Sequence, residues 1–440
     1  MLPVIEVTEK AAKKRKLFFI ALDGAADRKI AALGNRTPLE AARTPNLDTM
    51  VRSGQMSRIT VLKNGLAPES DSGAMALLGY PPEQYYCGRG TLECMGLETY
   101  RRYRYFAGFR INFAAVDYLN GTLDRRTGRG LSAQELQALT QEICNGVRLN
   151  DWDDISFELK TFGGFRGILG LYSNKTPLSG AVSNIDPGFV KQGNFSIPIN
   201  DYEPVPMSCV PLDGTPAAVT TAAIVNAFVK QCEQILRDSQ VNLRRKQLGQ
   251  MQPNCILVRD GGILPVSMPR FQDKYGAELA IYGQLPCEKA MADMMGGVFH
   301  YSQAFELQLD EAYLKQLAKT VMQEPADVIF CHLKGPDEPG HDNRPFDKVR
   351  AIELIDRSFF QELWKPGTEN LYVVSCDHAT PCDMGIHSSD KVPLLITGGG
   401  IIPDGTMHFD EENASRGTCP VDCATDILNY LFAENTYDGN

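Results

Sequence analysis

Short apolar runs that end in acidic residues, glycine or proline recur near both ends of the chain. KLFFIALDGAAD (residues 16–27), ADVIFCHLKGPDEPGHD (326–342) and NLYVVSCDHATPC (370–382) share this pattern, and KVPLLITGGG (391–400) is a further apolar run. Such runs predict strands buried in a parallel sheet. KVRAIELIDRSFFQELW (348–364) has apolar residues at helical spacing and lies between two of them. Strands that alternate with helices predict an α/β fold.

The middle of the chain breaks this alternation. Residues 115–300 mix short strands, Gly-rich turns and one long helical pattern, TTAAIVNAFVKQCEQILRD (220–238). A chain of 440 residues is long enough for two domains. We therefore expect a discontinuous domain of residues 1–114 and 301–440, with a smaller α+β domain of residues 115–300 inserted into it.

The composition is that of a globular protein, and the charge narrows the possible partners. Hydrophobic residues make up 43% of the chain and charged residues 22%, with a net charge of −10. This acidic balance argues against a broad nucleic-acid surface, so any anion site must be built locally. Apolar runs are too short for a membrane span or a signal peptide. Twelve scattered cysteines without a secretory signal favour reduced thiols and a cytoplasmic protein.

Acidic and histidine side chains gather where the predicted strands end. In a parallel sheet the carboxyl ends of the strands share one edge, where ligands bind. Carboxylate and imidazole ligands suit Mn²⁺ or Zn²⁺ better than Ca²⁺. Two such clusters could hold two ions about 3.5–4 Å apart, the spacing used for displacement at phosphorus. The candidate ligands are Asp23, Asp337, His341, Asp377, His378 and His387.

Ser70 lies in GLAPESDSGAMALLGY (residues 65–80), and the local pattern allows two interpretations of it. Ser70 or Ser72 could cap the helix predicted by the Ala-Met-Ala-Leu-Leu segment that follows. Alternatively, Ser70 is a nucleophile whose hydroxyl is activated by a metal ion. The stretch by itself does not separate the two.

The phosphate and carboxylate of a substrate would need cationic partners, for which arginine has a matching planar fork. Lys334, three residues before Asp337, could add positive charge at the metal site. Each arginine could equally be a solvated surface charge. The candidates in the middle region are Arg110, Arg125, Arg126, Arg129, Arg166, Arg244, Arg245 and Arg259.

Taken together, several motifs resemble a known family. They are LDGAAD, TPLEAARTPNLD, SDSGAMALLGY, YYCGRGTLECMG, FRINFAAVD, DRRTGR, NIDPG, VNLRRKQLGQMQPN, LVRDGG, HLKGPDEPGHD and CDHATPC. From about Lys16 to the C-terminus, the chain resembles the cofactor-independent (2,3-bisphosphoglycerate-independent) phosphoglycerate mutases of the archaeal type, in the alkaline phosphatase superfamily. The resemblance implies an alkaline-phosphatase-like parallel-sheet core and an inserted domain that closes over the substrate. It also implies two divalent metal ions, with Mn²⁺ expected ahead of Zn²⁺, Co²⁺ or Mg²⁺, and no bisphosphoglycerate cofactor.

The resemblance also assigns roles to residues of this chain. Ser70 becomes the phosphorylated nucleophile, and Lys334 a second catalytic residue. One metal ion would be held by Asp23, Ser70, Asp377 and His378. The other would be held by Asp337, His341 and His387. The implied substrate-binding residues are Arg110, Arg126, Arg129, Arg166 and Arg259.

The implied reaction interconverts 3-phosphoglycerate and 2-phosphoglycerate in glycolysis and gluconeogenesis. Ser70 takes the phosphoryl group, while the glycerate stays trapped, reorients and accepts that group on its other hydroxyl. Closure of the inserted domain excludes water, because a leaky site would act as a phosphatase. The sequence leaves the oligomeric state open.

Three residues depart from the family pattern near the implied substrate site. Glu69 stands where glycine usually precedes the nucleophile, Ala74 where His or Asn is common, and Gly188 where the family has the histidine of DPH. They leave open a phosphoryl or phosphonyl transferase, or a phosphatase, of the same family with another small substrate. A catalytically silent protein is disfavoured, because buried Asp and His ligands are costly without their ion.

Overall fold

The computed structural model describes residues 15–433 except 64, 99, 101–102, 118, 121, 126, 163–165, 200, 266, 303–309 and the side chain of residue 129. Its larger sheet has seven strands in the order β11-β10-β12-β1-β13-β14-β2, and only β14 runs against its neighbours. The apolar runs at both ends of the chain form its centre, which confirms the expected α/β fold with a parallel-sheet core. The strands are β1 (Leu17–Leu22), β2 (Gly54–Ile59), β10 (Leu279–Gly283), β11 (Val298–Tyr301), β12 (Val328–Leu333), β13 (Leu371–Ser375) and β14 (Val392–Gly398).

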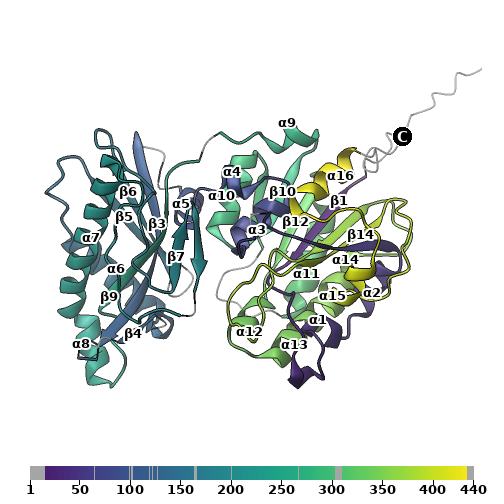
Figure 1. Cartoon of the computed structure of the whole chain (residues 1–440), viewed down its shortest axis with the longest axis horizontal. Helices are drawn as coiled ribbons and strands as arrows, with labels where there is room; N and C mark the ends of the chain where they lie inside the picture. The colour runs from purple at the N-terminus through teal and green to yellow at the C-terminus, as the bar shows by residue number, and fades with distance from the viewer. Residues whose placement is uncertain are drawn as a thin grey trace, which may run out of the picture.

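Helices cover both faces of this sheet, so its central strands are buried on both sides (Figure 1). The predicted helix over residues 348–364 is α13 (Pro345–Ile355), which continues through a π-helical turn (Asp356–Phe360) into α14 (Gln361–Leu363). It packs with α11 (Glu311–Gln323), α1 (Pro38–Ala41) and α2 (Pro45–Val51). The other face carries α3 (Ser70–Leu77), α9 (Phe271–Tyr275), α10 (Pro286–Met295) and α16 (Ile427–Ala433).

A second sheet, entirely antiparallel, has its own hydrophobic core. Its strands run in the order β4-β3-β6-β5, and β9 pairs with β3 on the edge opposite β6. The long helix predicted at residues 220–238 is α7 (Pro216–Arg237); Thr215 caps it by accepting from the Ala218 N–H. The remaining elements are β3 (Tyr105–Asp117), β4 (Thr122–Asp124), β5 (Ser156–Phe162), β6 (Arg166–Ser173), β9 (Cys255–Gly262), α6 (Ala133–Gly146) and α8 (Gln240–Gln247).

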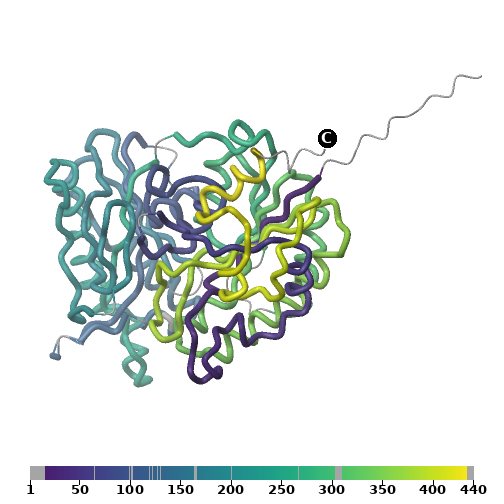
Figure 2. The backbone as a smooth tube through the Cα atoms, turned by 45° about the vertical axis from the view of Figure 1, so that its right-hand side comes forward, coloured from purple at the N-terminus to yellow at the C-terminus, as the bar shows by residue number. Residues whose placement is uncertain are grey.

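Helix α5 (Arg89–Gly96) lies between the two sheets (Figures 1 and 2). Two of its glycines allow this close approach. A Cβ on Gly90 would lie 2.5 Å from the backbone nitrogen of Arg110 in β3, and one on Gly96 would lie 1.8 Å from the carbonyl oxygen of Pro286 in α10. The helix therefore packs closely against β3 of the second sheet on one side and against α10, which covers the seven-stranded sheet, on the other.

Strand pairing divides the chain between the two sheets at other residues than the expected domain boundaries of 114/115 and 300/301. Strand β10 and all but the last residue of β11 fall inside the expected insert but pair within the seven-stranded sheet, and most of β3 precedes residue 115. We propose that the insert runs from about Tyr105 to about Gly262. A division at these residues keeps each sheet within one domain.

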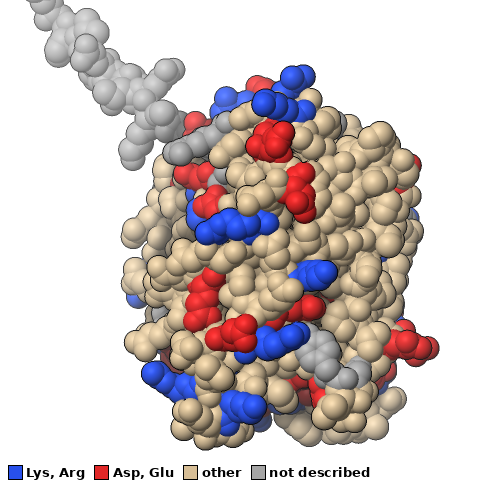
Figure 3. All heavy atoms as spheres, turned by 90° about the vertical axis from the view of Figure 1, so that its left-hand side faces the viewer, with Lys and Arg blue, Asp and Glu red and all other residues tan. Residues whose placement is uncertain are grey.

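The surface over the second sheet is mixed in charge. Figure 3 shows acidic and basic side chains interspersed among neutral ones on that face. Within the described ranges, no helix combines the length and the apolar character needed to cross a membrane.

Candidate active site

Three adjacent parallel strands bring the candidate metal ligands to one edge of the seven-stranded sheet. Asp23 directly follows β1, Asp377 lies two residues beyond β13, and Asp337 begins α12 (Asp337–His341) four residues beyond β12. Because β1 lies between β12 and β13, their carboxyl ends meet. The structure thus brings together all seven residues that the sequence singled out as ligands.

The Ser70 hydroxyl lies among the groups carried by β1 and β13. Its Oγ is 3.3 Å from Asp23 Oδ1 and 3.3 Å from His378 Nε2. His378 Nε2 is also 3.3 Å from Asp377 Oδ2. The other Asp377 oxygen accepts from the backbone N–H groups of Gly24 and His378, which fixes this buried carboxylate.

Ser70 is the first residue of α3, but its hydroxyl does not cap that helix. Ser72 makes the local contacts instead. Its Oγ accepts from the Glu69 N–H at 3.0 Å and donates to the Glu69 carbonyl at 3.1 Å. The capping interpretation of Ser70 is therefore wrong, and its hydroxyl faces Asp23 and His378.

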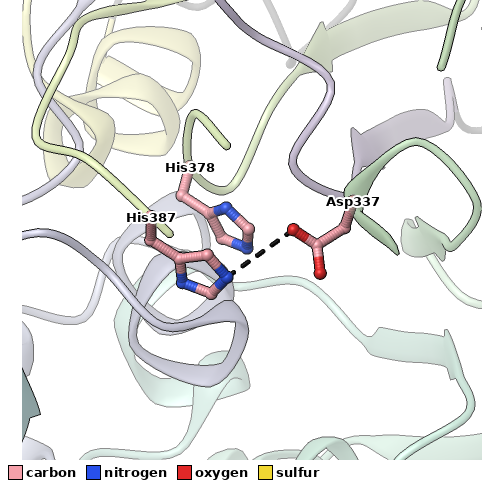
Figure 4. A group of neighbouring side chains, drawn as sticks. All are labelled: Asp337, His378 and His387. Atoms are coloured by element: carbon pink, nitrogen blue, oxygen red, sulfur yellow. Dashed lines mark ion pairs between the residues drawn. The ribbon is translucent and has the colours of Figure 1, made fainter. Parts of the chain in front are cut away.

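Asp337, His341 and His387 form a second group next to the first. The Asp337 carboxylate is 3.6 Å from His387 Nε2 (Figure 4) and 3.4 Å from His341 Nε2. The two Nε2 atoms are 3.1 Å apart. His378 joins the groups, since its ring stacks on that of His387 with centroids 3.7 Å apart. Donor atoms of Asp337, His378 and His387 lie within 4.8 Å of one another.

The three imidazoles are each held through Nδ1, while their Nε2 atoms face Asp337 or Asp23. Nδ1 of His341 is 2.8 Å from the Gly385 carbonyl, and Nδ1 of His387 is 2.8 Å from the Pro68 carbonyl. A carbonyl oxygen only accepts, so in both residues Nδ1 carries a proton and Nε2 can serve as a ligand. His378 Nδ1 contacts a hydroxyl at 3.0 Å in the same way. This donor set fits two divalent cations.

Opposite charges keep the site ionised in spite of its burial. Burial by itself would raise the pKa of Asp23, but Lys334 Nζ, 3.2 Å from Asp23 Oδ2, holds that pKa well below its ordinary value. Burial likewise disfavours a charged His387, whereas Glu69 and Asp337 raise its pKa to about 9. A divalent cation bound here would displace such protons, so we expect metal affinity to increase with pH.

Arginines from the second sheet form a cluster on the other side of the site. Arg110 on β3 is paired in register with Arg259 on β9, and Asn112 is paired with Arg166 on β6. Burial and the nearby Arg89 lower the pKa of Arg110, and burial together with Arg110 lowers the pKa of Arg166 to about 10. Buried cations that repel one another favour an anionic ligand.

Two glutamates partly neutralise this cluster. Arg89 donates from Nε to Glu93 Oε1 at 3.0 Å and from NH1 to Glu69 Oε2 at 3.1 Å. The other Glu93 oxygen is 3.6 Å from Arg110 Nε. Within the part of the chain that the structure describes, the buried Nε atoms of Arg110 and Arg259 have no hydrogen-bond acceptor. These two donors could bind an anion that enters the cluster.

Comparison with known proteins identifies the family. A family model described as 2,3-bisphosphoglycerate-independent phosphoglycerate mutase matches residues 52–242. A protein of that name from Aeropyrum pernix is 38% identical over 91% of this chain and 95% of its own length. One from Methanopyrus kandleri is 33% identical over 95% of this chain and 96% of its own. The chain belongs to the 2,3-bisphosphoglycerate-independent phosphoglycerate mutase family.

Solved structures agree with this family assignment. The cofactor-independent phosphoglycerate mutase of Thermoplasma acidophilum has a TM-score of 0.57 at 27% identity, over 95% of this chain and 99% of that one. A protein of Pyrococcus horikoshii has a TM-score of 0.74 at 26% identity, over 97% of this chain and 98% of that one. The resemblance deduced from the sequence motifs is confirmed.

The arginines expected to bind substrate have different surroundings. Arg110, Arg166 and Arg259 lie in the cluster, whereas Arg126 and the side chain of Arg129 lie outside the described residues. Arg125 forms a two-point ion pair with Asp186, at 2.6 and 2.9 Å. Arg245 is buried and bonded to Glu135 and to backbone carbonyls, which is a structural role.

Sequence reasoning overlooked His332 and Arg89. His332, on β12, is buried, with Nδ1 2.5 Å from Glu288 Oε1 and Nε2 3.0 Å from Asp377 Oδ2. It lies two residues before Lys334, so both side chains point to the same face of the extended segment, and this spacing could have identified it. Arg89 stands in the quoted motif YYCGRGTLECMG, but its buried position between two glutamates had no signal in the sequence.

Proposed function

We propose that the protein interconverts 3-phosphoglycerate and 2-phosphoglycerate through a phosphoserine at Ser70, without a bisphosphoglycerate cofactor. The observation that carries this proposal is the position of the Ser70 hydroxyl. It lies at the start of α3, 3.3 Å from groups of both Asp23 and His378. The amino end of a helix favours the negative charge of a phosphoserine.

Two divalent cations, Mn²⁺ ahead of Zn²⁺, Co²⁺ or Mg²⁺, would lower the pKa of the attacking hydroxyl and neutralise charge on the phosphoryl oxygens. One ion would be held by Asp23, Ser70, Asp377 and His378. The other would be held by Asp337, His341 and His387. The orientation of the imidazoles, with Nε2 turned toward the carboxylates, supports this assignment.

In the first half-reaction, Ser70 Oγ forms a bond to phosphorus as the bond to the 3-oxygen of the substrate breaks. The serine loses its proton, and the released 3-oxygen gains one. Lys334 stabilises the phosphoryl oxygens as a cation: burial opposes its charge, but Asp23 and Glu288 raise its pKa above the ordinary value. In the second half-reaction the 2-hydroxyl of the glycerate attacks the phosphoserine and frees Ser70.

Between the two steps the glycerate must be retained and water excluded. Arg110, Arg166 and Arg259 would bind its carboxylate, with Arg126 and Arg129 as further candidates from the same part of the chain. All of them belong to the proposed insert, so its closure against the metal-bearing sheet would complete the site. Such an enzyme would work in glycolysis and gluconeogenesis, and we place it in the cytoplasm.

Phosphorus NMR with 3-phosphoglycerate and Mn²⁺ tests the proposal directly. We expect a 2-phosphoglycerate signal without added bisphosphoglycerate, its loss in Ser70→Ala, and its retention in the control Ser415→Ala, at an exposed serine. Mass spectrometry of acid-quenched protein should find one phosphoryl group on the peptide that contains Ser70. Inorganic phosphate as the sole product, or turnover that survives Ser70→Ala, would contradict the mutase mechanism.

Two of the departures from the family pattern favour a second candidate, a phosphoryl or phosphonyl transferase or phosphatase with another small substrate. Glu69 places a carboxylate in the arginine cluster. A Cβ on Gly188 would lie 2.5 Å from Cζ of Arg125, so the guanidinium occupies the room that a histidine at position 188 would need. In the same NMR experiment, 3-phosphoglycerate left unchanged by Mn²⁺-loaded protein would favour this candidate.

A further inference from the structure

The carboxylate of Glu69 lies between the two halves of the site. Its Oε2 is 3.1 Å from Arg89 NH1, in the arginine cluster, and its Oε1 is 3.8 Å from His387 Nδ1, beside the metal ligands. The side chain is only 17% exposed. Since Glu69 directly precedes Ser70, its backbone is fixed by the start of α3.

The charges around Arg89 are balanced within the protein. Arg89 binds Glu69 through NH1 and Glu93 through Nε. Glu93 in turn faces Arg110, so two arginines are matched by two carboxylates. An anion that binds Arg89 therefore has to compete with Glu69 for the NH1 donor.

We propose that Glu69 is a built-in competitor for substrate anions: its carboxylate occupies Arg89 and must be displaced before a phosphate or carboxylate of the substrate can use that donor. This inference rests on the proposed phosphoryl-transfer function and adds a determinant of specificity to it. Glu69 weakens the binding of highly charged substrates and leaves the metal ligands in place. Glu93 remains on Arg89 when Glu69 moves, so the guanidinium keeps a partner throughout.

Inorganic phosphate, titrated calorimetrically into the Mn²⁺-loaded protein, is a suitable probe because its binding does not depend on turnover. We expect Glu69→Gln to bind phosphate about tenfold more tightly, since an ionic hydrogen bond no longer has to be broken. Glu69→Asp keeps the charge but is one methylene shorter, and it should gain less. The matched control Glu83→Gln removes an equal charge from an exposed position on α4 (Pro82–Tyr85) and should change affinity less than twofold.

A double-mutant cycle with Arg89→Lys separates competition for Arg89 from a general effect of charge. We expect most of the gain from Glu69→Gln to vanish in the Arg89→Lys background. An equal gain in both backgrounds would overturn the proposal, as would unchanged or weaker phosphate binding in Glu69→Gln. A gain of similar size in Glu83→Gln would overturn it as well. Failure to form 2-phosphoglycerate would count against the proposed function alone, because the phosphate titrations remain readable.

Discussion

The two halves of the candidate site handle charge in opposite ways. On the metal-bearing side, carboxylates and imidazoles at strand ends face one another across 3.1 to 3.6 Å, and added cations would complete them. On the other side, Arg110 on β3 lies near Arg89 at the start of α5, and the carboxylates of Glu69 and Glu93 partly neutralise this pair. One half is therefore suited to bind cations and the other to bind an anion. A phosphoryl-transfer site needs both.

The comparison also separates fixed groups from adjustable ones. The candidate metal ligands Asp377 and His387 are held by backbone N–H and carbonyl groups. The arginines are held mainly by the carboxylates of other side chains, which can exchange partners when a substrate arrives. We expect substitutions on the metal side to abolish chemistry and substitutions on the arginine side to weaken binding.

The largest effect should come from Asp377→Asn. Asparagine keeps the shape but removes the negative charge, so one metal site loses an anionic ligand and Ser70 loses its activation. We expect activity to fall by about a thousandfold or more, and metal content to drop from two ions per chain toward one. Mass spectrometry of bound metal together with an activity assay checks both. Asp390→Asn, at a partly exposed ion pair with Arg28, is the control and should keep both ions.

Arg110→Lys should have the next largest effect and should leave metal content at two ions. Lysine keeps the charge but lacks the planar fork that binds a carboxylate at two points. We expect kcat/KM to fall by about a hundredfold, mainly through KM. Arg237→Lys, at the exposed end of α7 in the same half of the molecule, should stay close to wild type. Loss of a metal ion in Arg110→Lys would break the distinction between the two halves.

The two halves also differ in how far the sequence predicted them. Candidate metal ligands such as Asp23 and Asp377 lie one or two residues beyond apolar strands, so the apolar runs and the polar residues that end them locate these ligands in the sequence. Arg110 and Arg259 lie inside strands, and they meet only through the antiparallel register of β3 and β9, which no local pattern records. The limits of the proposed insert also rest on long-range pairing, because β10 and β11 join the seven-stranded sheet and not the second one.

His332→Asn tests the residue that sequence reasoning overlooked. His332 connects Glu288 to the metal-side carboxylate Asp377, and it is a positioning residue rather than a ligand in the proposed assignment. We expect metal affinity to fall about tenfold, with kcat partly restored by excess Mn²⁺. His408→Asn, at a largely exposed histidine beside Asp48, should not change metal affinity. If His332→Asn instead loses one ion completely, His332 is itself a ligand, as its grouping with Asp23 and Asp377 permits.

The smallest effect concerns Glu411, a buried carboxyl outside the candidate active site. Glu411 begins α15 (Glu411–Arg416) and accepts hydrogen bonds from the Thr37 hydroxyl at 2.6 Å and the Asp27 N–H at 3.0 Å. With no cation paired to it among the described residues, burial dominates and raises its pKa to about 7. The pKa of Asp23 shifts in the opposite direction, because Lys334 lies beside that carboxylate.

The raised pKa of Glu411 makes the free energy of unfolding depend on pH. The folded state binds this proton more tightly than the unfolded chain, whose carboxyl has the ordinary value of 4.5. The stability that the neutral Glu411 contributes is complete below about pH 4.5 and is lost as the pH rises to about 7.

Glu411→Gln mimics the neutral form, and the Thr37 hydroxyl can rotate to accept from the new amide. Chemical denaturation should therefore find Glu411→Gln more stable than wild type at pH 8, by at most about 3 kcal/mol, and nearly equal to it at pH 4.5. A difference that does not change with pH, as expected for the control Glu83→Gln, would show that Glu411 is ionised in the fold and that burial does not decide its charge.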